Sequence, residues 1–200
     1  MKIRGRKHMQ LSRRTVLTSM IAVATAPHWA FAVERRRVLV AYYSYTGNTK
    51  SVAERVRTLV GGELLEIRLA DPYPLDIRRM AEQSKYELET GEFPPLLADP
   101  PDMSDYDLIL LGGPVWWNTV SAPVMSFLER VNFAGRRVGL FSTYALTPSH
   151  YETNFAAQAH NASIQSSLMI NEFDIAGGRA DDAIASWAFR ASPKDGPKTL

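Results

Sequence analysis

Hydroxyl side chains cluster in the six residues that follow the first strongly apolar run of the chain. Ser44, Thr46 and Thr49 supply the hydroxyls, and Gly47 allows the backbone to turn closely between them. A helix beginning at Asn48 would point its N-terminal N–H groups into this loop, where the helix dipole also favours an anion. The stretch has no Gly-Lys pair of the kind that contacts the β and γ phosphates in triphosphate-binding loops. It therefore predicts a site for one terminal phosphate, with an ordinary helix cap as the alternative.

Two adjacent tryptophans, Trp116 and Trp117, stand in a second segment that is suited to ligand binding. This segment, residues 112–118, follows the most apolar run of the chain and reads Gly-Gly-Pro-Val-Trp-Trp-Asn. On a loop, two neighbouring indoles cannot both point into one core, so at least one requires another partner. A flat aromatic ligand would be such a partner, because stacking excludes water from a large ring face. A pair buried in a core or an interface is the alternative.

The elements that must position these residues follow a regular alternation of apolar runs and helical patterns. This alternation indicates an α/β fold with one doubly wound parallel sheet of five strands. The predicted strands cover residues 38–43, 64–69, 108–111, 137–141 and 168–175. The predicted helices cover residues 48–60, 76–90, 124–131, 155–160 and 180–189. Ligands bind beyond the carboxyl ends of parallel strands, which is where the hydroxyl and tryptophan segments lie. The sequence does not indicate whether the proline-rich connector, residues 71–101, covers the ligand or mediates dimerisation.

The hydroxyl segment resembles the phosphate loop of flavodoxins, whose pattern is Ser or Thr, any residue, and then Thr-Gly-Asn-Thr. The resemblance extends from about residue 38 to 189. It implies a flavodoxin-like sheet with strand order 2-1-3-4-5 and FMN as the non-covalent cofactor. It also implies that the FMN phosphate is bound by Ser44, Thr46, Gly47, Asn48 and Thr49.

The tryptophan segment resembles one branch of flavodoxin-like proteins, which has Pro-x-Trp-Trp at this place. The resemblance implies that the isoalloxazine ring of FMN is bound by Pro114, Val115, Trp116, Trp117 and Asn118. Such a water-poor aromatic site would lower the reduction potential of the flavin.

A third loop, residues 142–155, offers two tyrosines for the second face of the flavin ring. Flavodoxins often have Tyr-x-x-Asn-Phe here, and the segment beginning at Tyr151 is similar. The Gly-acid-Gln segment of the family is replaced upstream by Thr143-Tyr144-Ala145, which makes Tyr144 a rival for the same role. Either tyrosine could instead cap the core. The neighbouring His150 could donate a proton, with plain solvation as the alternative.

Composition excludes several classes of function. At 46% hydrophobic residues the chain can build a packed core, and the absence of cysteine excludes disulfides, iron–sulfur clusters and thiolate nucleophiles. Six of the 23 Lys and Arg residues lie within residues 1–32, which contain no Asp or Glu. Residues 33–200 therefore have 17 basic against 21 acidic side chains, so no electrostatic footprint for nucleic acid is expected.

The first 32 residues have the pattern of an export signal. A basic stretch precedes a modestly apolar run, residues 16–26, and small residues at Ala30 and Ala32 stand where signal peptidase cleaves. The segment Ser12–Leu17, with Arg13 and Arg14, resembles the twin-arginine signal, which implies export of a folded protein to the periplasm. We therefore expect a signal peptide at 1–32, an FMN-binding domain at 33–191 and a loose tail at 192–200, with membrane contact only during export.

Three functions remain open from these residues. The first is electron transfer to a redox partner protein or a small-molecule acceptor, in which the protein binds and tunes the flavin. The second is an NAD(P)H-dependent quinone or nitro-compound reductase on the same fold. The third is a binding or scaffold domain without FMN, against which the complete phosphate loop argues. The pattern indicates neither the electron partner nor the oligomeric state.

Overall fold

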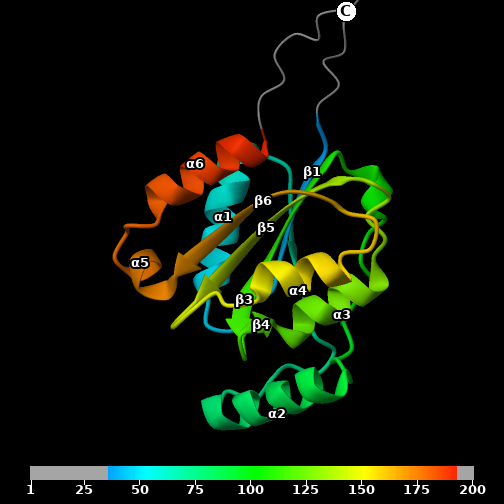
Figure 1. Ribbon diagram of the computed structural model, residues 1–200, viewed down its shortest axis with the longest axis vertical. Helices are drawn as coiled ribbons and strands as arrows, with labels where there is room; N and C mark the ends of the chain where they lie inside the picture. Colours follow the sequence, from blue (N-terminus) through cyan, green and yellow to red (C-terminus); the bar gives the residue numbers. More distant parts are fainter. Residues whose placement is uncertain (1–35, 193–200) are drawn as a thin grey trace, which may run out of the picture. The chain divides into compact units, whose positions relative to one another are not determined.

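A parallel sheet forms the centre of the computed structural model, which describes residues 36–192 (Figure 1). From one edge to the other, its strands are β2 (Glu63–Glu66), β1 (Val38–Tyr42), β3 (Leu108–Trp116), β5 (Arg137–Tyr144) and β6 (Ser163–Asn171). Each neighbouring pair on this path runs parallel. The short strand β4 (Thr119–Val120) lies off the path and pairs antiparallel with the end of β3. Because β5 and β6 are the fourth and fifth strands of the main path, the predicted order 2-1-3-4-5 is confirmed.

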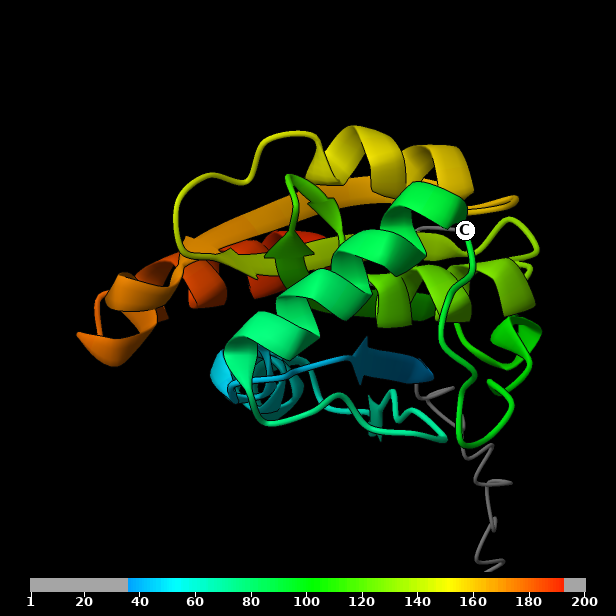
Figure 2. The ribbon, with the colours of Figure 1, turned by 90° about the horizontal axis from the view of Figure 1, so that it is seen from below.

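Helices cover both faces of the sheet (Figure 1). One face carries α1 (Asn48–Val60) and α6 (Asp181–Ala191), and the other carries α3 (Ala122–Arg130) and α4 (Tyr151–Gln158). The remaining helices are α2 (Ile77–Thr90), the short α5 (Glu172–Ala176) and a 3-10 turn at Met103–Asp105. Figure 2, a view from below, shows α2 in front of the β3–β4 hairpin. The connector, residues 71–101, which contains α2, thus lies against the carboxyl edge of the sheet.

The helix α1 has the predicted bounds because its apolar spacing and its stop signal agree. Val52, Ala53 and Val56 are fully buried against the sheet. Gly61 and Gly62, with φ of 76° and 94°, end the helix in backbone conformations that residues with a Cβ rarely adopt. The start and the end of this helix are therefore determined within the segment itself.

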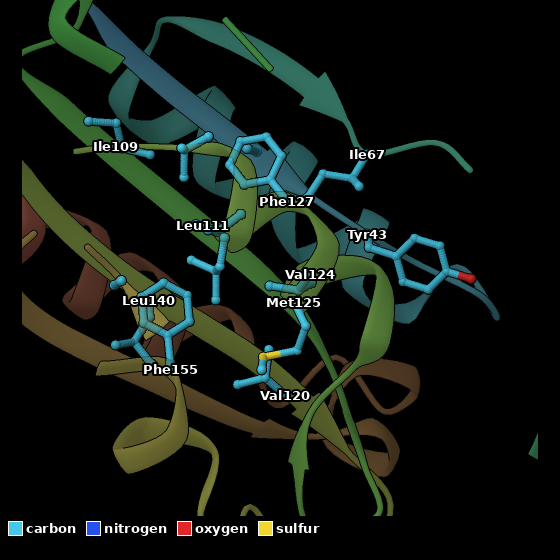
Figure 3. Close-up of a cluster of buried hydrophobic side chains, with 14 of the residues drawn as sticks. Tyr43, Ile67, Ile109, Leu111, Val120, Val124, Met125, Phe127, Leu140 and Phe155 are labelled. Atoms are coloured by element: carbon cyan, nitrogen blue, oxygen red, sulfur yellow. The ribbon is translucent and has the colours of Figure 1, made fainter. Parts of the chain in front are cut away.

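The core on the α3 and α4 face is a continuous cluster of apolar side chains (Figure 3). It joins Ile109 and Leu111 of β3 to Phe127 of α3 and Phe155 of α4, all at 1% exposure or less. Full burial of such a side chain contributes about 1.5–3 kcal/mol. This packing makes the sheet and its helices a rigid support for the loops at the carboxyl edge.

The second and last strands differ from prediction. The strand expected at 64–69 ends at Glu66, and Leu69 instead forms an isolated antiparallel bridge with Leu96 of the returning connector. The last strand begins at Ser163, where the edge is exposed and no apolar run marks it. It ends at Asn171, whose side chain accepts a hydrogen bond from the Phe173 N–H (3.0 Å) and so caps α5, where strand was expected up to residue 175.

Two predicted segments lie largely outside the described residues. They are the signal peptide at 1–32 and the tail at 192–200, of which only Ser192 is described. Among the helices of residues 36–192, none combines the length and the apolar character that a membrane crossing requires.

Candidate functional site

The N-terminus of α1 has the geometry of an anion site. Gly47 precedes it with a left-handed φ of 94°, and no side chain caps the helix. The N–H of Ser51 bonds to the Gly47 carbonyl (3.0 Å), whereas the N–H groups of Asn48, Thr49 and Lys50 have no acceptor among the described residues. Such first-turn N–H groups require an outside partner, and the helix dipole favours a negative one. The residues present therefore fit a phosphate, and the ordinary helix cap that was the alternative is not formed.

The three hydroxyls of this loop differ in their burial and in their hydrogen bonds. Ser44 Oγ accepts from the Gly47 N–H (3.1 Å), which shapes the loop. Thr49 is 1% exposed, and its Oγ1 lies 2.7 Å from Oγ1 of Thr143 at the end of β5. Only Thr46 is exposed and has no hydrogen-bond partner among the described residues. Of the three hydroxyls predicted to bind phosphate, the Thr46 hydroxyl is thus the one that makes no hydrogen bond to a described residue.

Asn48 is held by a residue that sequence reasoning did not identify. Its Nδ2 donates to Oε2 of Glu172 (3.1 Å), the first residue of α5. The contact joins residues 124 positions apart. No local pattern marks Glu172 as a neighbour of the loop, so only the packing of β6 beside β5 brings it there.

The tryptophan segment is a β-hairpin, which corrects the expected loop at 112–118. Strand β3 continues to Trp116 and turns through Trp117 and Asn118, with φ of 50° and 64°. It returns as β4, with Trp116 opposite Thr119. Two left-handed residues in a row match the twist of a two-residue hairpin turn, and Asn tolerates this conformation. The Trp-Asn step between β-forming residues was the signal that could have revealed the turn.

The two indole rings contact different residues. Trp116 is half-buried, and three tyrosine rings meet it edge-on, with centroid distances of 5.7 Å (Tyr43), 6.2 Å (Tyr45) and 5.4 Å (Tyr73). Trp117 is 51% exposed. Neither ring is fully buried, as expected for neighbours that cannot share one core.

Trp117 is tied to α2. Its Nε1 donates to Ser84 Oγ (3.2 Å), and the Lys85 ammonium lies 5.6 Å from its ring centroid. The connector also borders the phosphate loop, because the Tyr45 hydroxyl donates to the Pro74 carbonyl (2.8 Å). The connector therefore forms one wall of the site.

The third loop lies against the hairpin and contains one of the two candidate tyrosines. The His150 N–H donates to the Asn118 carbonyl (3.2 Å), and Asn154 Nδ2 donates to Thr119 Oγ1 (2.7 Å). Tyr144 ends β5 half-buried at the carboxyl edge. The other candidate, Tyr151, is 0% exposed.

Tyr151 is therefore a core residue, which corrects the prediction that it faces the flavin. Its ring stacks on Phe155 at a centroid distance of 6.3 Å, and burial raises the pKa of its hydroxyl. It sits at the first position of α4, whose buried side points into the sheet. Its ring offers no face to a ligand, and Tyr144 is left as the candidate.

The three segments meet through a short chain of contacts. Pro114 of the hairpin is the register partner of Thr143 in the sheet, and Thr143 meets Thr49 of the phosphate loop. Residues from three separate segments thus converge at the carboxyl edge, beside an uncapped helix N-terminus. A doubly wound sheet with this arrangement defines a flavodoxin-like protein.

The chain belongs to the flavodoxin family, whose model matches residues 37–188. Among solved structures, it is similar to the flavoprotein of Lactobacillus acidophilus in complex with FMN, at 25% identity and a TM-score of 0.61, over 71% of this chain and 97% of that one. A protein of Bacteroides uniformis described as a flavoprotein is 28% identical with a TM-score of 0.61, over 76% and 97% of the two chains.

The chain is also similar in part to a curated protein that is named as an enzyme. The NAD(P)H dehydrogenase (quinone) of Archaeoglobus fulgidus is 29% identical over 99 residues, which cover 46% of this chain. This chain spans 50% of the length of that relative. The likeness therefore concerns only part of the relative.

Proposed function

We propose that this protein is an electron-transfer flavoprotein that holds FMN non-covalently at the carboxyl edge of its sheet. The observation that carries the proposal is the uncapped start of α1, where three N–H groups have no acceptor among the described residues. Membership of the flavodoxin family and the similarity to a flavoprotein solved with FMN support the same cofactor.

Different residues of the site would bind the phosphate and the ring of FMN. The N–H groups of Asn48, Thr49 and Lys50 would hold the phosphate, and the Thr46 hydroxyl would add a fourth donor. Trp116 and Tyr144 would flank the ring and exclude water from it. The bound cofactor would supply one- and two-electron chemistry, so no acid–base side chain is required for transfer between a donor and an acceptor.

A titration of the FMN-free protein tests this assignment. FMN should bind with quenching of flavin fluorescence, and riboflavin, which lacks the phosphate, should bind at least about tenfold more weakly, because each hydrogen bond to a charged group contributes roughly 1.5–3 kcal/mol. Equal affinity for the two would refute the phosphate site. Failure to bind either would favour the FMN-free scaffold.

The second candidate is an NAD(P)H-dependent quinone or nitro-compound reductase. The partial likeness to a quinone dehydrogenase favours it. In this reaction NAD(P)H gives up a hydride, which carries two electrons and one proton, and the quinone takes these together with a second proton from the solvent. Stopped-flow mixing of the FMN-loaded protein with NADPH distinguishes the candidates. Rapid bleaching of the flavin followed by quinone turnover supports the reductase, and no bleaching supports transfer from a protein or small-molecule donor.

We also propose export to the periplasm by the twin-arginine route. The proposal is supported by Arg13, Arg14 and the small residues at Ala30 and Ala32, all outside the described residues. Cell fractionation tests it with the Arg13→Lys, Arg14→Lys double variant. Export of the parent and retention of the variant in the cytoplasm are expected, and equal export of both would contradict the route.

A further inference from the structure

The helix α2 contains a buried carboxylate that forms no ion pair with any residue of 36–192. Glu87 is 6% exposed, and both of its oxygens accept hydrogen bonds from neutral groups. The Tyr73 hydroxyl donates to Oε2, and Gln83 Nε2 donates to Oε1 (2.9 Å). The nearby Lys85 pairs with Glu89 instead (3.6 Å), and within residues 36–192 no ion pair reaches Glu87. Burying a carboxylate without a cation is unfavourable.

The carboxylate is connected to the ring site through aromatic side chains. Tyr73, which donates to Glu87, meets the Trp116 ring edge-on at 5.4 Å. Burial, and then the hydrogen bond to Glu87, raise the pKa of Tyr73, so this tyrosine remains a donor. Tyr43, at 5.7 Å from Trp116, also has a raised pKa, first through burial and then through Tyr45 and Glu87. The charge of Glu87 therefore acts on the side chains that surround Trp116.

We propose that Glu87 is a positioning residue that lowers the reduction potential of this site. Through Tyr73 it orients the Trp116 ring, and its negative charge opposes the arrival of electrons on a cofactor bound against that ring. The inference rests on the proposed function, because it requires FMN beside Trp116. A charge in the protein interior acts over longer distances than one in water, since the effective dielectric constant is lower.

The decisive comparison is Glu87→Gln against Glu82→Gln in the FMN-loaded protein. Gln keeps the shape and an acceptor oxygen for Tyr73, and Gln83 can turn its amide to accept from the new NH₂ group. Glu82 lies on the same helix with an exposed side chain, so its replacement makes the same change of charge outside the site. The midpoint potential is measured by dithionite titration with a reference dye, and the affinity for oxidised FMN by fluorescence.

Glu87→Gln should raise the potential, so that the ratio of affinities for reduced and oxidised FMN increases by about tenfold, equivalent to about 59 mV for a one-electron couple. Glu82→Gln should leave both the potential and the affinity for oxidised FMN unchanged. A parent-like potential in Glu87→Gln overturns the inference while the proposed function stands. A parent that binds no FMN overturns both.

A second variant tests the positioning role in the FMN-free protein. Tyr73→Phe keeps the ring beside Trp116 and removes the link to Glu87. It should change the near-ultraviolet circular dichroism of Trp116, whose bands are identified by difference from Trp116→Phe. An unchanged Trp116 signal would overturn the inference even if Glu87→Gln failed to fold.

Discussion

The hydroxyl oxygens of Thr49 and Thr143 lie 2.7 Å apart, and this buried contact joins the first turn of α1 to the end of β5. The two threonines are 94 positions apart in the chain. This pair therefore contributes a direct contact between the phosphate loop and the third loop, on which the proposed FMN site depends.

Replacing Thr143 by Val should destabilise the fold. Val keeps the β-branched shape but leaves the Thr49 hydroxyl, which is 1% exposed, without this partner. The free energy of unfolding in urea should fall by about 1–3 kcal/mol. Thr49→Val should behave alike, and the double variant should lose less than the sum of the two. The exposed Thr46→Val serves as the control, with a change within about 0.5 kcal/mol. A Thr143→Val protein as stable as the parent would show that the contact contributes nothing.

Thr46→Ala should weaken FMN binding without weakening riboflavin binding. The lost hydrogen bond to a charged phosphate costs roughly 1.5–3 kcal/mol, about tenfold or more in the dissociation constant. Thr58→Ala is the matched control, because Thr58 lies near the other end of α1 and its hydroxyl bonds to the Glu54 carbonyl (2.8 Å). Equal loss for FMN and riboflavin in Thr46→Ala would mean that this hydroxyl does not contact the phosphate.

Gly47→Ala should combine a loss of stability with a loss of FMN affinity. An added Cβ meets nothing within 4 Å, so the cost is that of a left-handed φ of 94°, about 1–2 kcal/mol. Gly178→Ala is the matched control, since Gly178 also has a left-handed φ (68°) and open space around it but lies between α5 and α6. Thermal unfolding should show similar losses in both variants, whereas only Gly47→Ala should bind FMN more weakly. Weaker binding in both would point to a global effect.

Stability should fall in alkaline solution partly through Tyr106. Burial, and then the hydrogen bond to Glu63 (2.8 Å), raise the pKa of Tyr106 from its ordinary value of 10.0 to about 12. The folded state therefore holds this proton more tightly than the unfolded state. The resulting stabilisation is complete below pH 10 and is lost as the pH rises towards about 12. Urea unfolding of the parent and of Tyr106→Phe should converge over this range. A constant difference between them would contradict the linkage.

Several parts of the site were predictable because their causes are local. The turn at Gly47, the start of α1 at Asn48 and its end at Gly61 follow from backbone preferences within a few residues. The strand order was predicted through the family resemblance and agrees with the sheet. The turn at Trp117 and Asn118 was also local, but the run of aromatic and β-forming residues around it was interpreted as a loop.

Patterns along the chain were enough to predict the sheet, the helix that points its N-terminus at the carboxyl edge, and the residue types gathered there. Which of these residues can meet a ligand depended on the packing of the folded chain. Tyr151 lies in the core and Tyr144 at the edge, Thr49 is paired with Thr143, and Trp116 reaches Glu87 through Tyr73. The physical reason is that side-chain burial and pairing between distant segments depend on how helices pack on the sheet, whereas turns and helix ends depend on the few residues that form them.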